Sequence, residues 1–389
     1  MSGGLDSSVT AWLLAQSGIP VIGLSMLLWD RSQEAVNGRC CGALDLSDAR
    51  RVAQQAGIPH YTLRLDREFQ AQVVDPFVAD YLDGRTPSPC VRCNTWIKFD
   101  LLHERARRLG AERIATGHYA RIVDGPGGPE LHAARDAGKD QSYYLFELTR
   151  EQLAASLFPL GELTKSEVRE LARQAGLVVA EKGESMEVCF VAHGVREFVE
   201  TQVAAAPGRF PGAVTGAPAT LVDRAGGELG AGQPYYRYTV GQRRGLGLPA
   251  RQPLYVLAIE PRQNRVVVGG EEELFARGLI GERLHWIGPP PGWPADLPLP
   301  ALPAGRDPAD PASPELVATV KIRSRHPGVA ACIRPRARRR PDAGARGAAL
   351  ETVEVEFAEP QRGVTPGQAA VFYQGSRVLG GCWIQGRLG

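Results

Sequence analysis

The stretch Ser2-Gly3-Gly4-Leu5-Asp6-Ser7-Ser8 runs directly into a segment with helical periodicity, residues 7–18. Glycines let the backbone approach an anion closely, and hydroxyl and amide groups at a helix N-terminus supply hydrogen-bond donors. A lone Gly-Gly turn with a Ser or Asp cap would be an ordinary helix start. The full pattern, followed by a helix and a βαβ order, instead predicts a phosphate-binding loop. It is not a Walker A loop, because no Gly-Lys-Ser/Thr follows.

Working outward from this loop, helical and strand patterns alternate along the first half of the chain. We expect helices over residues 7–18, 43–56, 70–82 and 165–175 and from about residue 99, and strands over 19–26, 60–65 and 113–117. Such alternation is typical of an α/β domain with a doubly wound parallel sheet, which binds ligands at the carboxyl ends of its strands. We predict that this domain spans residues 1–200.

After about residue 200, short β-type runs are separated by Gly and Pro turns. These runs cover residues 235–240, 254–259, 265–270, 316–322, 352–359, 368–373 and 377–384. They predict two small β-rich domains, a central one over residues 201–274 and a barrel-like one over residues 275–389. The Pro/Ala/Arg-rich segments 289–315 and 335–349 can bury little and are predicted to be loops.

Composition bounds the class of protein. No stretch among the 389 residues approaches the roughly 20 consecutive apolar residues of a membrane helix. The first residues show neither the basic nor the apolar part of a signal peptide, so we expect a cytoplasmic protein with no membrane partner. Because the net charge is only +2, an RNA partner would need a local basic surface.

The seven cysteines form an odd set, which argues against a disulfide framework. Cys90 and Cys93 make a Cys-x-x-Cys with prolines and cations close by in the sequence. The prolines predict an irregular loop that keeps the thiols outside a helix, and the cations favour thiolates. Without a second Cys-x-x-Cys, a four-cysteine zinc site is not expected. Cys189, in the segment 182–190, would on its own be interpreted as a core residue.

Taken together, these three segments resemble the tRNA-specific 2-thiouridylases, whose first motif is the PP-loop of the ATP pyrophosphatases. The likeness continues over nearly the whole chain, in residues 115–119, 139–143, 157–161, 238–247 and 365–369. The resemblance implies a tRNA-uridine 2-sulfurtransferase that acts on the wobble position of tRNA. It further implies ATP and Mg²⁺ as cofactors, AMP and pyrophosphate as products, and a persulfide-carrying sulfur-donor protein as a partner.

The resemblance also implies individual roles. The residues matching the ATP site are Ser2, Gly3, Gly4, Asp6, Ser7, Ser8, Met26 and Gly117. Cys93 matches the nucleophile and Cys189 the persulfide carrier. The residues matching tRNA contacts are Ser88, Pro89, Cys90, His118, Lys139, Asp140, Gln141, Arg323, Ser324 and Gln368. Position 90 departs from the family, which commonly has Asp there. Met26 can equally be a core side chain, and His118 a structural imidazole.

The reaction requires activation, because the C2 oxygen of uridine is a poor leaving group. Adenylation lets that oxygen depart with AMP, and sulfur from a Cys189 persulfide attacks C2. Cys93 attacks the persulfide, giving a Cys93–Cys189 disulfide, or sulfide is released first. In one alternative, Cys90, Cys93 and Cys189 hold a [4Fe–4S] cluster whose fourth iron carries the sulfide. Two others are a PP-loop ligase acting on a small metabolite and an RNA-binding protein without turnover.

One expectation concerns the first residue. A PP-loop normally follows a buried strand, whereas this sequence begins at Met1 of the loop itself. A missing central strand leaves unpaired backbone groups beside it. We therefore expect a truncated or mis-started sequence, in which an upstream extension rich in Val and Ile would raise stability and activity.

Overall fold

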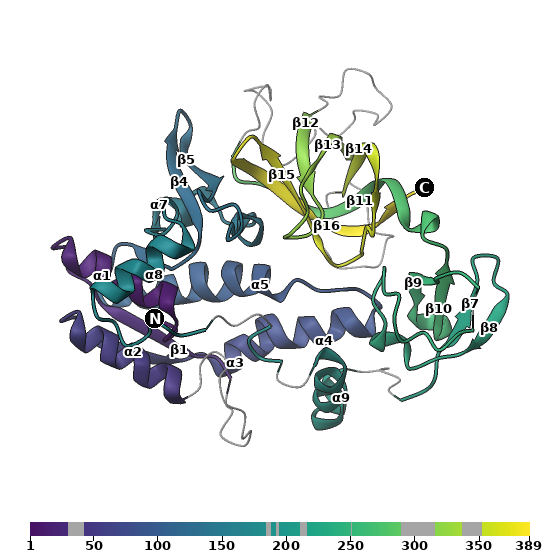
Figure 1. The fold of residues 1–389 in the computed structure, drawn as a ribbon, viewed down its shortest axis with the longest axis horizontal. Coiled ribbons are helices and arrows are strands. Elements are labelled where there is room, and N and C mark those ends of the chain that lie inside the picture. The colour runs from purple at the N-terminus through teal and green to yellow at the C-terminus, as the bar shows by residue number, and fades with distance from the viewer. Residues whose placement is uncertain are drawn as a thin grey trace, which may run out of the picture. The chain divides into compact units, whose positions relative to one another are not determined.

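The computed structural model describes eight stretches of the chain, residues 1–29, 43–183, 188–191, 194–210, 216–249, 251–288, 316–336 and 352–389. They form two compact units (Figure 1). The first unit comprises Met1–Asp75, Pro89–Gly194 and Ser376–Val378. The second comprises Pro76–Ser88, Val195–Gly375 and Leu379–Gly389. No helix among the described residues is long and apolar enough to cross a membrane.

The first unit alternates helices and strands. In chain order its elements are α1 (Leu5–Gln16), β1 (Gly23–Leu27), α2 (Ala43–Gln55), β2 (His60–Arg64), α3 (Asp66–Phe69), η1 (Gln70–Val74), α5 (Pro89–Arg92), η2 (Cys93–Leu101), α6 (Leu102–Arg108), β3 (Ile114–Ala115), β4 (Ala120–Gly125), β5 (Gly128–Ala133), η3 (Ser142–Leu145), α7 (Arg150–Ala154), β6 (Ser156–Leu157) and α8 (Lys165–Gln174). Strand β1 pairs in parallel with β2, and β3 pairs in parallel with β6. The predicted α/β domain with parallel strands is confirmed.

A single apolar cluster joins α1, α2 and α8. Val9 of α1, Val52 of α2 and Val168 of α8 are all fully buried in it. Helix α8 begins with a capping box, in which the Thr164 hydroxyl accepts from the Glu167 amide and the Glu167 carboxylate accepts from the Thr164 amide. This packing fixes the N-terminus of α1, and with it the loop in front of α1.

The second unit holds the β-rich parts. Its elements are α4 (Asp75–Leu82), α9 (Val195–Ala205), η4 (Pro207–Arg209), β7 (Thr220–Val222), β8 (Glu228–Ala231), η5 (Tyr235–Arg237), β9 (Tyr255–Glu260), η6 (Pro261–Gln263), β10 (Arg265–Gly269), η7 (Glu272–Leu274), β11 (Phe275–Trp286), β12 (Leu316–Lys321), β13 (Val329–Arg336), β14 (Thr352–Arg362), β15 (Ala369–Gln374) and β16 (Arg377–Leu388). Strands β7 to β10 form a four-stranded sheet in the order β8-β7-β10-β9. The predicted central β-rich part is confirmed.

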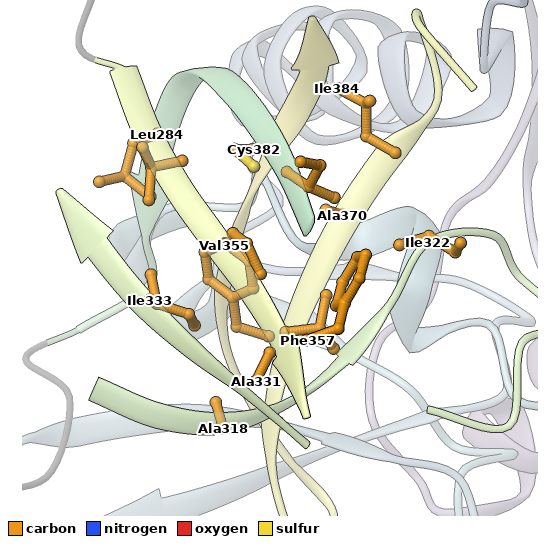
Figure 2. Close-up of a cluster of buried hydrophobic side chains, with 14 of the residues drawn as sticks. Leu284, Ala318, Ile322, Ala331, Ile333, Val355, Phe357, Ala370, Cys382 and Ile384 are labelled. Atoms are coloured by element: carbon orange, nitrogen blue, oxygen red, sulfur yellow. The ribbon is translucent and has the colours of Figure 1, made fainter. Parts of the chain in front are cut away.

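A closed barrel follows that sheet. Among the described strands the order is β11-β14-β13-β12-β15-β16, and β16 pairs back onto β11. Closure leaves no sheet edge between these strands. Figure 2 shows its interior, where Val355, Ile333 and Cys382 are fully buried. Gly281 is required inside, because a Cβ there would lie 2.3 Å from the Cys382 sulfur. The barrel-like prediction is confirmed.

One predicted strand, residues 235–240, is wrong. Tyr235–Arg237 instead form a short 3₁₀ turn after Pro234. The phenol of Tyr235 donates to the Leu82 carbonyl at 2.8 Å, and the phenol of Tyr236 donates to Glu200 at 2.8 Å. These tertiary hydrogen bonds outweigh the β-propensity of the aromatic residues, which is a weak and context-dependent preference.

Candidate active site

The loop before α1 folds back on itself. The Ser2 amide donates to the Ser7 hydroxyl oxygen at 3.0 Å, and the Ser7 hydroxyl donates to the Gly4 carbonyl at 3.2 Å. Gly3 has a φ of +73°, and a Cβ there would lie 2.0 Å from the Asp45 carbonyl oxygen. Among the residues that the structure describes, no side chain caps the N-terminus of α1. The first amides of this helix are therefore available to an anion, as the motif predicts.

Two further features fit a phosphate group. Ser8 is fully buried, and its hydroxyl has no hydrogen-bond partner among the described residues. Gly117 lies against the loop, since a Cβ there would come within 2.9 Å of the Ser7 amide nitrogen. The structure thus brings Gly117, predicted on the ATP site, next to the loop.

Asp6 of this loop is held by two side chains. Its Oδ1 accepts from the Lys165 ammonium at 2.7 Å and from the Tyr119 phenol at 2.9 Å. Lys165 is the first residue of α8, so the core that positions α8 also positions this cation. The ion pair fixes the orientation of the Asp6 carboxylate at the loop.

Met26 lies near the carboxyl end of β1, as expected for a residue beside the nucleotide. It is partly buried and packs with Leu63 against the cluster that contains Leu102 and Ile114. The packing supports the core interpretation of Met26, and contact with ATP stays a prediction.

The cysteine pair lies in a helix, so the predicted irregular loop is wrong. Residues 89–108 are continuously helical, with Cys90 in α5 and Cys93 at the start of η2. Proline at position 89 is compatible with this because the first helical position needs no amide hydrogen. The η2 stretch is π-helical over nine residues. Turns of π-helix are rare in proteins, and those that occur are often found at functional sites. The side-chain amide of Asn94 donates to the Tyr144 backbone carbonyl at 3.0 Å.

Burial also overturns the prediction that these thiols ionise readily. It raises the pKa of Cys93, and the Lys98 ammonium lowers that pKa by a smaller amount. Burial also raises the pKa of Cys90, and the charge of Lys98 lowers it by a smaller amount. Part of the Cys90 side chain is nevertheless exposed. Loss of hydration outweighs the neighbouring cation in both cases.

His118 is buried at 7% exposure and holds Lys98 in place. Its Nε2 is 3.4 Å from the Lys98 Nζ, and its Nδ1 is 2.7 Å from the Thr116 hydroxyl. Burial, followed by the charge of Lys98, lowers the pKa of His118 well below its ordinary value. The neutral imidazole therefore accepts from the ammonium at Nε2. This geometry supports the structural interpretation of His118, and a contact with tRNA stays a prediction.

Cys189 is partly exposed in the same unit as the cysteine pair. The next residue, Phe190, is buried and packs edge-to-face on Phe69, with ring centroids 5.5 Å apart. Residues 184–187 of the segment 182–190 lie outside the described residues. So do Cys40, Cys41 and the arginines 338–340 of the predicted loop 335–349. In the described part of the chain, no three His, Cys, Asp or Glu side chains are grouped to hold a metal ion, and the trio Cys90, Cys93 and Cys189 does not form such a group.

In the first unit, the predicted tRNA contacts at 139–141 brace a turn. The Asp140 carboxylate accepts from the amides of Ala134 and Ser142, both at 3.1 Å. The Gln141 side-chain oxygen accepts from the Tyr119 amide at 2.9 Å. Lys139 begins this turn, where its amide donates to the Asp136 carbonyl at 3.0 Å.

In the second unit, Gln368 donates to the carbonyls of Thr86 at 2.9 Å and Pro87 at 3.3 Å. Ser88 is buried at 6% exposure. Arg323, beside Ser324 in the bend after β12, donates to the Arg362 carbonyl at 3.3 Å. These contacts give Gln368 and Arg323 a structural role, and contact of all four residues with tRNA stays a prediction.

Sequence reasoning included Lys98 among the cations near the cysteine pair but missed the lysines around the loop. Lys182 begins the segment 182–190, so its position was a usable signal. No sequence motif singles out Lys165. The same holds for Asp45 and Asp48, the two aspartates that accept hydrogen bonds from Lys182. Only the fold brings them to the loop.

Comparisons with known proteins agree with this arrangement. Residues 1–193 match the family described as tRNA methyl transferase HUP domain, residues 196–270 the tRNA methyl transferase PRC-barrel domain, and residues 307–384 the aminomethyltransferase beta-barrel domain. The tRNA-specific 2-thiouridylase MnmA of Geobacter metallireducens is 47% identical over 392 residues, 99% of this chain and 95% of that relative. Its namesake in Geotalea uraniireducens is 46% identical, with 99% and 93% covered.

A solved structure, the U34-tRNA thiolase NcsA from Methanococcus maripaludis with its [4Fe–4S] cluster, aligns at a TM-score of 0.31 and 18% identity. The alignment covers 55% of this chain and 65% of that chain. A likeness at this level carries no argument about the site.

Proposed function

Because the chain belongs to the tRNA-specific 2-thiouridylase family, we propose that it catalyses ATP-dependent 2-thiolation of the wobble uridine in tRNA. The observation that supports this most directly is the loop Ser2–Ser8. Within the described part of the chain, it offers helix amides without a side-chain cap and a buried Ser8 hydroxyl without a hydrogen-bond partner, and the backbone of Gly117 lies against it. These are groups that suit a triphosphate.

In the first step, the uridine C2 oxygen attacks the α-phosphorus of ATP. The new O–P bond replaces the bond to pyrophosphate, which leaves. Donors of the loop stabilise the charge on the transferred group without reorganising, since packing already fixes them. Mg²⁺ would arrive with ATP and screen its phosphates. The target base must leave its stack, which suits a single-stranded anticodon loop.

In the second step, the terminal sulfur of a Cys189 persulfide attacks C2, and the former oxygen departs with AMP. Cys93, after losing its proton, attacks the Cys189 sulfur and breaks the S–S bond. The 2-thiouridine is released, and a Cys93–Cys189 disulfide forms. A thiol reductant then restores both cysteines, and a donor protein reloads Cys189 with persulfide sulfur. In the alternative order, Cys93 releases sulfide before the attack on C2.

Two sequence-based interpretations remain open to test. No grouping of side chains in the described residues supports the [4Fe–4S] route, and iron analysis after anaerobic purification tests it. A small-molecule ligase would form AMP without tRNA. The cytoplasmic location also stays a prediction.

The loop itself provides the first prediction. Replacing Asp6 or Ser7 by Ala should abolish formation of AMP and pyrophosphate, because each removes a polar group that shapes the loop. The circular dichroism spectrum should be unchanged. The assay incubates the enzyme with tRNA, Mg²⁺, ATP and a persulfide source and measures nucleotides and 2-thiouridine by mass spectrometry. Products of ADP and phosphate would contradict the PP-loop assignment.

A further inference from the structure

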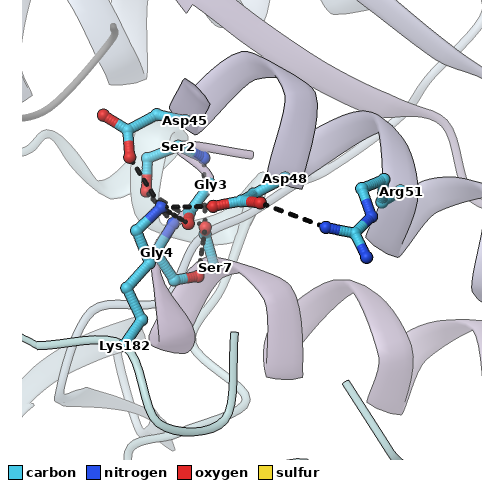
Figure 3. A network of polar contacts seen from close by, with 8 residues as sticks. All are labelled: Ser2, Gly3, Gly4, Ser7, Asp45, Asp48, Arg51 and Lys182. Carbon is cyan, nitrogen blue, oxygen red and sulfur yellow. Dashed lines mark hydrogen bonds and ion pairs between the residues drawn. The ribbon is translucent and has the colours of Figure 1, made fainter. Parts of the chain in front are cut away.

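Lys182 joins three parts of the first unit that are far apart in sequence. Its ammonium donates to the Gly3 carbonyl at 2.9 Å, to Asp45 at 2.7 Å and to Asp48 at 2.6 Å (Figure 3). An ammonium has three N–H donors, so these three acceptors use all of them. The side chain therefore links the nucleotide loop, the first two turns of α2 and the segment after α8.

The backbone of Lys182 is anchored from its own side. Leu177 and Val179 are buried in the core cluster that contains Val9 of α1. The Lys182 amide donates to the Val179 carbonyl at 3.0 Å. The chain reaches Cys189 seven positions later, so Lys182 is the anchored point from which the chain to this cysteine departs.

The charges explain why the loop needs this cation. The backbone of Asp45 lies directly against Gly3, and the carboxylates of Asp45 and Asp48 would repel a triphosphate bound at the loop. Partial burial lowers the pKa of Lys182, but hydrogen bonds and charge attraction from Asp45 and Asp48 outweigh burial, and the net pKa is raised. The ammonium is thus retained at neutral pH and compensates the carboxylates.

We propose that Lys182 is a positioning residue that couples occupancy of the Ser2–Ser8 loop by ATP to the placement of Cys189. This rests on the proposed function, in which Cys189 carries the sulfur. In the clamped state, Lys182 keeps its contacts with Gly3, Asp45 and Asp48, and its ammonium lies beside the loop. That charge attracts a bound phosphate, so ATP interacts more strongly with the clamped state than with a state in which Lys182 is released. ATP thereby holds the start of the chain that leads to Cys189, and sulfur delivery is tied to nucleotide binding.

The test uses the full chain and follows alkylation of Cys189 by iodoacetamide, mapped by peptide mass spectrometry, with and without Mg²⁺ and a non-hydrolysable ATP analogue. In the unmodified protein the analogue should slow alkylation by about fivefold or more, the lower range of site-to-site coupling. Lys182→Met should lose this response and bind the analogue about tenfold more weakly, a loss typical of a charged hydrogen-bonding group. Lys182→Arg should restore part of both, because it keeps the charge.

Arg51→Met is the matched control. Arg51 lies 3.9 Å from the same Asp48 carboxylate, with 61% of its side chain exposed, and should leave both readouts unchanged. Asp45→Asn weakens the contacts of Lys182 without removing the lysine. It should give an intermediate loss of both the alkylation response and the affinity for the analogue. A full alkylation response in Lys182→Met, with the analogue bound at saturation, would overturn the proposal. Intact coupling in a protein that makes no 2-thiouridine would support the clamp and refute the proposed function.

Discussion

At the scale of single residues, the structure separates thiols that the sequence presents alike. Cys90 keeps an exposed surface, Cys93 is half-buried beside Lys98, and Cys382 is fully buried in the barrel. The motifs predict which cysteines take part in sulfur transfer, but they do not predict how readily each thiol ionises. Desolvation depends on the tertiary neighbours of each thiol, and no sequence pattern records those neighbours.

The cysteines give the next prediction. Cys93→Ser and Cys189→Ser should abolish 2-thiouridine formation, because a hydroxyl cannot exchange disulfides. Cys90→Asp should stay active, since a carboxylate is the common family residue there. Liquid chromatography with mass spectrometry of tRNA nucleosides measures all three. Cys382→Ser is the control; it should keep activity at a packing cost of about 1–3 kcal/mol. Robust thiolation by Cys93→Ser would contradict the proposed chemistry.

At the scale of elements, regular periodicity predicts well and special geometry does not. The expected helices over 7–18, 43–56 and 165–175 appear as α1, α2 and α8 within a few residues. The π-helical stretch η2 was not predicted, because its pattern differs little from an α-helix in sequence. The hairpin of β4 and β5 was also missed, since residues 120–133 were interpreted only through their flanking motifs.

Helix α9 and turn η5 give an element-scale prediction. The Glu200 Oε2 accepts from the Arg237 Nη2 at 2.6 Å, and the Glu200 Oε1 accepts from the Tyr236 phenol at 2.8 Å. The hydrogen bond from Arg237 is the main cause of the lowered pKa of Glu200. A lowered folded-state pKa contributes stability above the unfolded pKa, and this stability is lost as pH falls through the folded value. Glu200→Gln should therefore cost about 1 kcal/mol at pH 7, towards the upper end for such a pair.

The measurement is the free energy of unfolding of both proteins at pH 7 and at pH 3. The difference between Glu200→Gln and the parent should shrink progressively as the pH falls below the ordinary carboxyl range, because the parent carboxylate then begins to take up a proton. Glu197→Gln, on the same helix, is the control, because the side chain of Glu197 is exposed. An equal difference at both pH values would show that charge is not the cause.

At the scale of the whole molecule, two compact units predict two unfolding transitions. Gly281→Ala should reduce the free energy of unfolding of the second unit by about 1–3 kcal/mol, because the added Cβ would meet the Cys382 sulfur at 2.3 Å. Only the transition whose temperature ATP does not raise should therefore shift down. Gly386→Ala, on the same barrel, is the control, because no described residue lies within 4 Å of its added Cβ. Scanning calorimetry with and without ATP measures both. A shift of the ATP-sensitive transition by Gly281→Ala would contradict the assignment of the units.

The interleaved order of the two units has a consequence for synthesis on the ribosome. Residues 76–88 belong to the second unit, although the chain on both sides of them belongs to the first. Buried Phe77 packs on Phe198, and Arg85 pairs with Glu282 at 2.8 Å. The nascent chain must therefore carry an unburied Phe77 until more than a hundred further residues have emerged. A nascent chain stalled before Phe198 would therefore expose Phe77 and would bind chaperones that recognise exposed apolar segments. The predicted first boundary at residue 200 lies just after Phe198, and a fragment that ends there still lacks Glu282, the ion-pair partner of Arg85.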